Sequence, residues 1–174
     1  MRRLLLLRHA KAEPWDSRDD FDRELTERGQ NDARHIGDLL VASDMLPDLI
    51  VYSSARRTRQ TAEAVASRLP RAVESLEENA LYEATRYLVL EVLRDLPDDA
   101  RTILVVGHNP GVGDTANYLA GDGPKDQRQR MASKYPTSGL AVLEFELDSW
   151  ANIEPHRARL RRFVSPADLG LRNS

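Results

Sequence analysis

The chain has 174 residues and carries 25 Lys and Arg against 28 Asp and Glu, which gives a formal net charge of −3. This length predicts one domain over residues 1–174, large enough to bury about 70% of its unfolded surface. A mildly acidic chain is a poor general binder of nucleic acid, because such binding depends on neutralising phosphates, so we expect no nucleic-acid partner. The absence of cysteine excludes disulfide scaffolds, thiolate zinc sites and cysteine nucleophiles. Any histidine chemistry must use one of four residues: His9, His35, His108 and His156.

The amino-terminal segment Met1–Leu7 does not have the pattern of a targeting segment. Its apolar run is too short for the core of a signal peptide, and Arg8, His9 and Lys11 follow it at once. No apolar run in the chain approaches the roughly 18–20 residues that span a bilayer. We therefore expect a soluble, cytoplasmic protein without a membrane partner.

Four short apolar runs predict β-strands, in chain order Leu4–Leu7, Leu49–Tyr52, Ile103–Val106 and Leu140–Leu147. Continuous runs such as the first three are typical of strands that are buried on both faces, as in a parallel sheet. The fourth run alternates in part between apolar and polar residues, which is typical of an edge or antiparallel strand.

Apolar residues at helical spacing predict four helices between and after these strands. The first stripe, over residues 33–41, follows Thr26, whose side chain is suited to cap a helix. The others lie at 62–69, 89–96 and 112–120, and each is stopped by a proline or a glycine. Strands that alternate with helices predict an α/β fold whose sheet is covered by helices on both faces.

Three polar stretches complete the chain. Asp16–Asp22 and Asp122–Pro136 are rich in turn-forming residues and are predicted to be surface loops. The basic stretch 157–162 is predicted to be a solvated face of a helix or a strand rather than a binding patch.

Residues suited to binding an anion follow three of the predicted strands. Arg8 and His9 follow the first strand, arginines of the 56–59 segment follow the second, and His108 follows the third. If these strands are parallel neighbours, their carboxyl ends lie at one edge of the sheet, where ligands of open α/β sheets bind. The helix after residues 110–111 would add backbone N–H groups at its positive end. The sequence therefore predicts a phosphate pocket at this edge.

Two arginines and two histidines form a sufficient set for phosphoryl transfer. Guanidinium groups offer planar forks to phosphate oxygens and stay charged. One neutral imidazole can attack phosphorus in line and carry the phosphoryl group, and a second, protonated imidazole can donate to the remaining oxygens. Because this catalysis is mainly positioning and electrostatic stabilisation, we expect no metal and no cofactor. A carboxylic acid is also needed where the leaving group is a poor alkoxide.

The order and spacing of these residues resemble the histidine phosphatase superfamily over nearly the whole chain. Leu7–Lys11 is similar to the Arg-His signature of that family, and Val106–Pro110 is similar to its third motif. Ser53–Ala62 resembles the second motif, Ser-x-x-x-Arg-x-x-Gln-Thr-Ala. Asp22–Gly29 resembles the Arg-Pro-Leu-Thr-x-x-Gly segment, with Glu24 in place of the usual proline.

The small size of the chain and the segment Tyr135–Ser138 are most similar to the SixA-type protein phosphohistidine phosphatases. This resemblance implies a phosphoglycerate mutase-like fold, which is a three-layer α/β/α sandwich around a mostly parallel central sheet.

The resemblance also implies a role for each matched residue. His9 would be the nucleophile, phosphorylated during turnover, and Arg8 would hold the phosphate. Arg57 lies three places before the glutamine of the second motif, so it is the arginine that would bind phosphate there. His108 would be the second histidine of the pocket, and Asn109 beside it is predicted to contribute to substrate binding.

A proton donor is the open question of the predicted site. Members that act on alcohol phosphates often carry a glutamate in a Leu-x-Glu segment between the second and third motifs, and Glu83 stands at that place. Two interpretations remain open, a catalytic proton donor and an exposed loop carboxylate. SixA-type proteins often lack the acid, since an imidazole leaving group needs less assistance. Trp15 is interpreted as a core residue or as a wall of the pocket, while His35 and His156 have no matched role.

Three functions are compatible with these residues. The first is a phosphatase that acts on phosphohistidine in a protein, or on a small phosphorylated metabolite, through a covalent phosphohistidine intermediate. The second is a phosphoglycerate mutase, which uses the same pocket but has more chain than residues 62–81 between the second motif and the acid. The third is a regulatory module that binds phosphate without turnover, against which the intact set of pocket residues argues.

Overall fold

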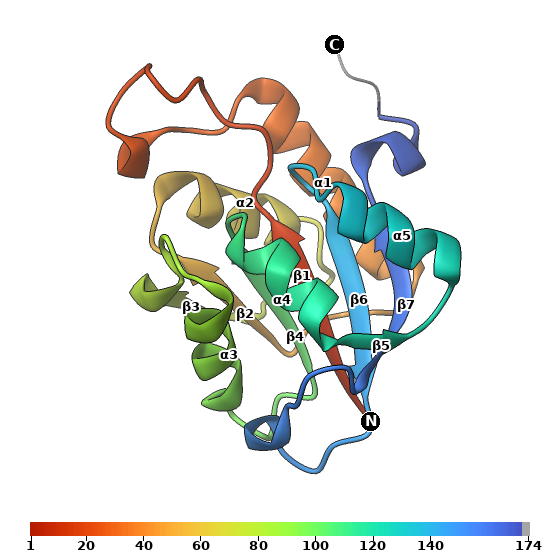
Figure 1. Cartoon of the computed structure of the whole chain (residues 1–174). Coiled ribbons are helices and arrows are strands. Elements are labelled where there is room, and N and C mark those ends of the chain that lie inside the picture. Colours follow the sequence, from red (N-terminus) through yellow and green to blue (C-terminus); the bar gives the residue numbers. More distant parts are fainter. Residues whose placement is uncertain (172–174) are drawn as a thin grey trace.

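A seven-stranded sheet forms the centre of the protein in the computed structural model, which describes residues 1–171. The strands lie in the order β3-β2-β4-β1-β6-β7-β5 (Figure 1). Their bounds are β1 Arg2–Arg8, β2 Leu49–Ser53, β3 Glu74–Glu78, β4 Thr102–Gly107, β5 Ala120–Asp122, β6 Leu140–Phe145 and β7 Ala158–Val164.

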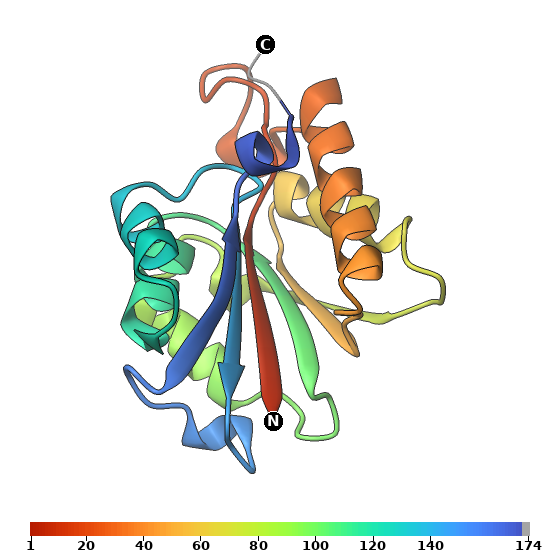
Figure 2. The same cartoon turned by 90° about the vertical axis from the view of Figure 1, so that its right-hand side faces the viewer.

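Helices cover both faces of this sheet. Figure 2 shows α1 and α2 on one side of the strands and α3, α4 and α5 on the other. Their bounds are α1 Glu27–Ala42, α2 Arg56–Ala66, α3 Arg86–Arg94, α4 Gly111–Leu119 and α5 Lys125–Ser133. The fold is therefore the expected three-layer α/β/α sandwich with a mostly parallel sheet.

The continuous apolar run of β1 is explained by burial on both of its faces. Leu4 and Leu6 pack with residues of α3 and α4, whereas Leu5 and Leu7 pack with residues of α1 and α2. All four side chains are fully buried. Alternate residues of a strand point to opposite faces, so a strand between two helical layers needs apolar side chains at every position.

The three strands that precede the candidate site residues are parallel neighbours, as predicted. β4 lies between β1 and β2 and pairs in parallel with both. Arg8 at the end of β1 pairs with Gly107 at the end of β4, and Tyr52 in β2 pairs with Val106. The carboxyl ends of these strands therefore meet at one edge of the sheet.

The predicted helices and the fourth strand are present with modest shifts of their bounds. Thr26 caps α1 by accepting a hydrogen bond from the Gly29 backbone N–H. β6 is antiparallel to β1 and to β7, so it lies inside the sheet and is not an edge strand. The basic stretch at residues 157–162 falls largely within β7, where Arg159 and Arg161 are exposed and Leu160 is buried.

The interpretation of Asp122–Pro136 as a surface loop is wrong, because α5 occupies most of it. Met131 is the one buried residue of this helix, so its sequence carries no apolar stripe for periodicity to detect. No apolar run marks β3, since Glu74–Glu78 is largely exposed at the edge of the sheet and is rich in glutamate. Across residues 1–171, no helix combines the length and apolar character needed to cross a membrane.

The start of α1 is fixed against the chain that follows His9. The Lys11 carbonyl accepts hydrogen bonds from the backbone N–H of Thr26, at 3.0 Å, and from its hydroxyl, at 3.2 Å. A Cβ atom on Gly29 would lie 2.1 Å from the same carbonyl oxygen. The glycine of the Leu-Thr-x-x-Gly segment is therefore needed for close approach of two backbones.

We predict that Gly29→Ala lowers the free energy of unfolding by about 1–3 kcal/mol, because the methyl group forces α1 away from Lys11. Alanine is the better helix former, so local helix propensity alone would give the opposite sign. Urea unfolding measures the change. Asn31→Ala, at an exposed position of the same helix, is the control and is expected to change stability by less than about 0.5 kcal/mol. A Gly29→Ala protein as stable as the wild type would contradict this account.

Candidate active site

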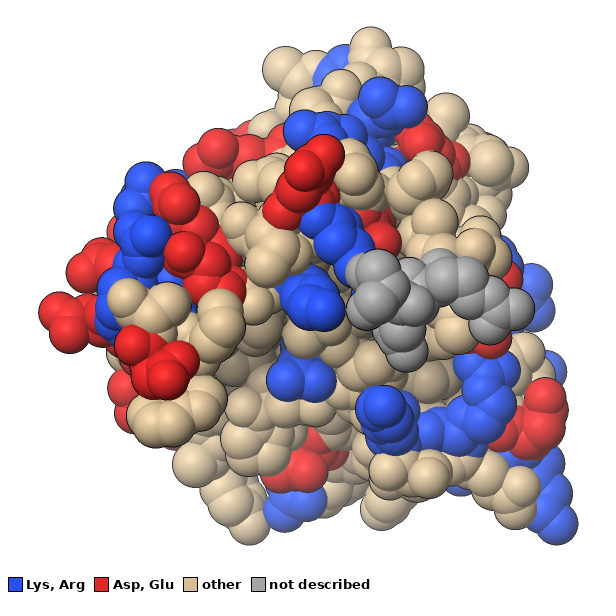
Figure 3. Space-filling model, turned by 90° about the horizontal axis from the view of Figure 1, so that it is seen from above, with Lys and Arg blue, Asp and Glu red and all other residues tan. Residues whose placement is uncertain are grey.

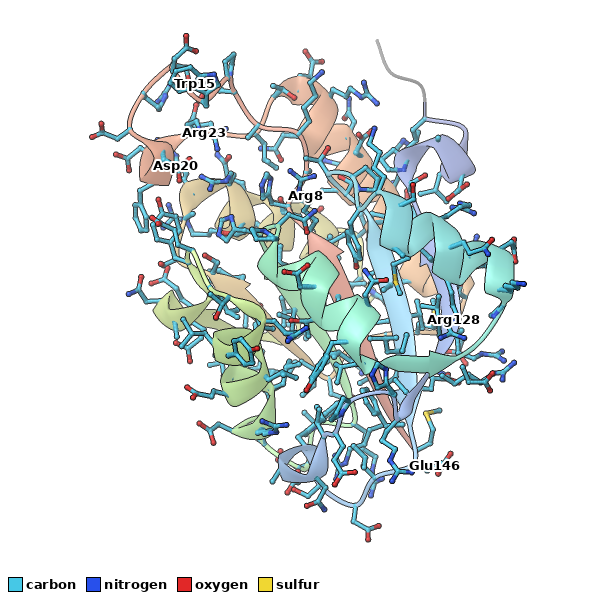
Figure 4. The ribbon with its side chains drawn as sticks, in the orientation of Figure 1. Arg8, Trp15, Asp20, Arg23, Arg128 and Glu146 are labelled. Carbon is cyan, nitrogen blue, oxygen red and sulfur yellow. The ribbon has the colours of Figure 1, made fainter. Side chains whose placement is uncertain are left out.

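The structure brings four sequence-predicted residues together at the carboxyl edge of the sheet. Arg8 ends β1 and His9 follows it, Arg57 lies in the first turn of α2, and His108 follows β4. Figure 4 shows Arg8 at this upper end of the strands. Viewed from above in Figure 3, a line of Lys and Arg side chains crosses the middle of this face. The edge therefore combines two histidines with concentrated positive charge.

The His9 side chain is buried and held in one orientation. Its Nδ1 lies 2.8 Å from the Ala10 carbonyl oxygen. Because a carbonyl only accepts, Nδ1 carries the proton and Nε2 keeps its lone pair. Burial, together with the charges of its neighbours, lowers the pKa of His9 to about 3. His9 is thus a neutral imidazole at pH 7, with no hydrogen bond to Nε2 from any residue in 1–171.

The tautomer of His108 is fixed by two partners. Arg57 Nη2 lies 3.2 Å from His108 Nδ1, and a guanidinium only donates, so Nδ1 accepts. His108 Nε2 therefore carries the proton and donates to the Ser53 hydroxyl at 2.7 Å. Burial, followed by the positive charge of Arg57, lowers the pKa of His108 to about 4. The two imidazole rings lie 5.5 Å apart between their centres, with His9 and His108 facing one space.

The two arginines are held by acceptors at their outer nitrogens. Arg57 donates from Nη1 to the Asp20 carbonyl at 2.6 Å and from Nη2 to the Asp20 carboxylate at 3.1 Å. Arg8 donates from Nη1 to the Tyr135 carbonyl at 3.0 Å. The Nε atoms of both arginines are buried without a hydrogen-bond partner in residues 1–171. Burial and the nearby charge of Arg57 lower the pKa of Arg8, so an anion in this pocket would relieve unfavourable charge.

The backbone around His9 is held by hydrogen bonds from two sides. The Thr61 hydroxyl accepts from the Ala10 N–H at 3.0 Å and donates to the Arg57 carbonyl at 2.7 Å, which links the first and second motifs. The backbone N–H of Ser138 contacts the carbonyls of Arg8 and His9, both at 3.1 Å. These bonds fix the relative positions of the two elements that carry the pocket.

The Asn109 side chain is engaged with the protein itself. Its amide nitrogen donates to the Tyr135 carbonyl at 2.9 Å, and its oxygen accepts from the Gly113 N–H at 3.1 Å. Arg8 donates to the same Tyr135 carbonyl. In this arrangement Asn109 positions the acceptor of Arg8, and its predicted contact with substrate stays a prediction.

Glu83 lies at the edge of the pocket but is not joined to it. The side chain is exposed and has no hydrogen bond or ion pair with residues 1–171, and its backbone is left-handed with a φ of 56°.

The adjacent Tyr82 does reach the pocket. Its ring packs edge-on against His108 at 5.6 Å, and its hydroxyl donates to the Asp20 carboxylate at 2.6 Å. Burial and this acceptor raise the pKa of Tyr82 to about 12.

Trp15 has neither of its predicted positions. The side chain is 80% exposed, and Figure 4 places it on the outer part of the loop that follows the first motif, so it is not a core residue and does not line the pocket. His35 is exposed on α1, as expected, and His156 is exposed near the start of β7.

Sequence reasoning did not assign the partners of the pocket residues. Ser53 and Thr61 belong to the quoted second motif, so the motif itself contained a signal for them. Asp20 begins a three-residue 3-10 helix and Tyr82 follows another, and no local pattern connects them with Arg57 or His108. Their roles depend on contacts between residues far apart in the chain.

Comparisons with known proteins point to one family. Residues 4–85 match the model of the histidine phosphatase superfamily, branch 1. A protein of Mycobacterium tuberculosis, itself uncharacterized, is 35% identical over 162 residues, which cover 92% of this chain and 99% of that protein. A crystal structure of a putative phosphohistidine phosphatase SixA from Agrobacterium tumefaciens is 33% identical, with a TM-score of 0.79. That match covers 95% of this chain and 98% of the other.

A shorter similarity concerns a different enzyme. A 2,3-bisphosphoglycerate-dependent phosphoglycerate mutase of Cutibacterium acnes is 42% identical over 64 residues. Those residues cover 34% of this chain and 25% of the mutase. This similarity is therefore local.

We predict that His9 and His108 stay uncharged from pH 8 down to pH 5, since their pKa values of about 3 and 4 lie well below the ordinary value of about 6.5. Nitrogen NMR of the imidazoles measures this, and it should show a proton on His9 Nδ1 and on His108 Nε2. Ser53→Ala removes the acceptor of His108 Nε2–H but leaves the Arg57 donor at Nδ1, so the Nε2 signal is expected to shift while the proton stays on Nε2.

Ser54→Ala is the matched control for that measurement. Ser54 is also buried, but its hydroxyl bonds Asn79 and not the pocket, so the variant should keep the wild-type pattern. A His9 signal that titrates near pH 6.5 would contradict the assigned charge state.

Proposed function

The chain belongs to the histidine phosphatase superfamily and is of the SixA type, and on that premise we propose that it hydrolyses phosphohistidine in proteins through a phosphorylated His9. One observation carries the proposal. His9 is neutral, its Nδ1 is bound to the Ala10 carbonyl, and its Nε2 is unoccupied beside Arg8, Arg57 and His108. A nucleophile with this charge state and orientation needs no general base.

In the first step, His9 Nε2 attacks the phosphorus of a phosphohistidine whose other ring nitrogen carries a proton. The bond from phosphorus to the substrate nitrogen breaks, and its electron pair leaves with that nitrogen as neutral imidazole. The His9 ring then carries the phosphoryl group on Nε2 and a positive charge, which its Nδ1–H shares with the Ala10 carbonyl. In the second step, water attacks the phosphorus, inorganic phosphate leaves, and His9 returns to its neutral form.

The pocket stabilises the charge on the transferred group in both steps. Arg8 and Arg57 supply fixed positive charge, which interacts more strongly in a partly buried site than in water. A phosphate dianion near His108 favours its protonated form, because an opposite charge raises the pKa of an imidazole. The added proton lies on Nδ1, which would then donate to the phosphate in place of accepting from Arg57, while Ser53 keeps the ring in place through Nε2–H.

The weak attachment of Glu83 supports an imidazole as the leaving group. An exposed carboxylate without partners is poorly placed to deliver a proton in a fixed geometry. A phosphohistidine whose other ring nitrogen is protonated leaves as neutral imidazole, and the conjugate acid of imidazole has an ordinary pKa of about 6.5. Such a group leaves with far less assistance than an alkoxide. Small phosphoesters with good leaving groups remain the second candidate substrates.

A groove beside the pocket supports a protein as the bearer of the phosphate. It has a volume of about 910 Å³ and runs between the start of α1, α5 and the end of β7. Lys11, two residues after the nucleophile, lines it together with Lys134, Pro136 and Phe163. An open groove of this kind, partly apolar and with basic residues, can accept a surface larger than a metabolite.

The alternatives are less well supported. The similarity to a phosphoglycerate mutase is confined to 64 residues, a quarter of that enzyme. A module that only binds phosphate would have no use for a nucleophile with a free Nε2. A cytoplasmic location and activity without metal stay predictions.

We predict that His9→Ala lowers the turnover of a generic aryl phosphate by at least about 10³-fold, because the covalent step is lost. The wild type, quenched during turnover, should carry one phosphoryl group on His9, which is detected by mass spectrometry at alkaline pH. His35→Ala, at an exposed histidine outside the pocket, is the control and should keep full activity. Full activity of His9→Ala would contradict the mechanism.

The wild type is also expected to keep full activity in EDTA, because the predicted pocket works without a metal.

We predict that Glu83→Gln changes the turnover of a chemically phosphorylated histidine peptide by less than about twofold, since the imidazole leaves without a strong acid. Glu91→Gln, an exposed carboxylate on α3, serves as the control for a change of charge. A loss of tenfold or more on the peptide would assign Glu83 as a proton donor and would favour phosphoester substrates.

A further inference from the structure

The Asp20 carboxylate contacts the phosphate-binding arginine directly. Asp20 accepts hydrogen bonds from both terminal nitrogens of Arg57, one through its carbonyl at 2.6 Å and one through its carboxylate at 3.1 Å. The remaining nitrogen of Arg57, Nε, is buried and without a partner in the described chain. Arg57 is itself only 5% exposed. The two terminal nitrogens that Arg57 could offer to a phosphate are therefore already bonded to Asp20, one to its carbonyl and one to its carboxylate.

Asp20 belongs to a loop that closes on itself. At its base, the Glu13 N–H donates to the Glu24 carbonyl at 2.9 Å, and the Glu13 carboxylate accepts from the Glu24 N–H at 2.7 Å. Inside the loop, Arg23 donates to the Glu13 carbonyl at 2.8 Å and to the Asp20 carboxylate at 2.9 Å. Residues 13–24 thus form a compact unit with a narrow base, which we call the lid.

The lid is fastened to the pocket by contacts that can be broken. The Asp20 carboxylate also accepts from the Tyr82 hydroxyl at 2.6 Å, and Phe21 packs edge-on against the Tyr82 ring at 5.2 Å. The Asp20 side chain is 48% exposed, and Phe21 is 41% exposed. Because the Asp20 carboxylate is about half exposed, an anion that binds Arg57 more strongly can compete with it and return it to water.

From this arrangement we propose that Asp20 is an internal competitor of the substrate phosphate, and that the lid must release Arg57 before phosphate binds. A phosphate dianion carries more charge than one carboxylate and has more acceptor oxygens, so it displaces Asp20 once it reaches the pocket. The same contact keeps Arg57 paired while the pocket is empty, which limits the cost of a buried, uncompensated charge. This inference rests on the proposed function only in taking phosphate as the ligand of the pocket.

The charge of Asp20 suits it to this role, and the same loop contains a residue for comparison. Its hydrogen bonds with Tyr82 and Arg23, together with the charge of Arg57, hold its pKa far below the usual range, so the group is an anion at all working pH values. Asp20 also shares its loop with Asp22, which is exposed and forms no side-chain bond with the described residues. The lid therefore offers a second carboxylate of similar exposure that does not contact Arg57.

The test compares Asp20→Asn with Asp22→Asn by calorimetric titration with inorganic phosphate at pH 7. Both variants remove one negative charge from the same turn, but only the first removes the ionic contact with Arg57. We expect Asp20→Asn to bind phosphate about fivefold more tightly than the wild type and Asp22→Asn to bind it within twofold. Weaker or equal binding by Asp20→Asn would show that the carboxylate only orients Arg57 and would overturn the proposal.

Hydrogen exchange supplies a second measurement. The backbone N–H groups of Asp22 and Arg23 are bonded to carbonyls within the same turn. If phosphate displaces the lid, saturating phosphate should make residues 13–24 of the wild type exchange faster, although ligands usually slow exchange. In Asp20→Asn these residues should exchange fast with and without phosphate. Slower exchange in the presence of phosphate would mean that the lid closes on its ligand, which would overturn the proposal.

The same experiments separate this inference from the proposed function. Absence of phosphate binding by the wild type would count against the pocket itself and against the proposed function as well. Normal phosphate binding and a phosphorylated His9, together with an unchanged affinity in Asp20→Asn, would remove the lid proposal alone.

Discussion

Two arginines held side by side in a partly buried pocket are the constraint on which the rest of the site depends. Burial and the charge of Arg57 both lower the pKa of Arg8, because two guanidinium charges share one partly buried pocket. The same surroundings keep His9 and His108 neutral. A bound phosphate dianion would offset the repulsion between these positive charges, and this gain in electrostatic energy would favour its binding.

Holding such charges in place requires a rigid surrounding backbone. The Tyr135 carbonyl accepts from both Arg8 and Asn109, and the Thr61 hydroxyl links the chain after His9 to α2. Each of these partners comes from a different segment of the chain. Several elements that meet at one edge of the sheet therefore set the positions of the site residues. Substitutions of residues that do not touch the substrate can consequently disturb the geometry of the site.

Much of this arrangement was predictable from local pattern. The apolar runs of β1, β2 and β4 predicted a parallel sheet, because a strand covered on both faces has no polar position. Once those strands are parallel neighbours, Arg8, His9 and His108 must meet at one edge. α5 was not predictable in this way, since a helix with Met131 as its one buried residue has no apolar stripe, and its position depends on contacts with distant parts of the chain.

The sequence by itself determined the kind of chemistry. The absence of cysteine excluded thiol chemistry, and the motifs around His9, Arg57 and His108 contained the candidate nucleophile and its candidate anion-binding partners. Only the tertiary structure decided which nitrogen of each imidazole carries the proton and which acceptor holds each arginine. It also brought Asp20 to Arg57 across 37 positions of the chain. Spacing along a chain reveals residues that share one element, whereas charge state and competition for an arginine depend on neighbours that only folding brings together.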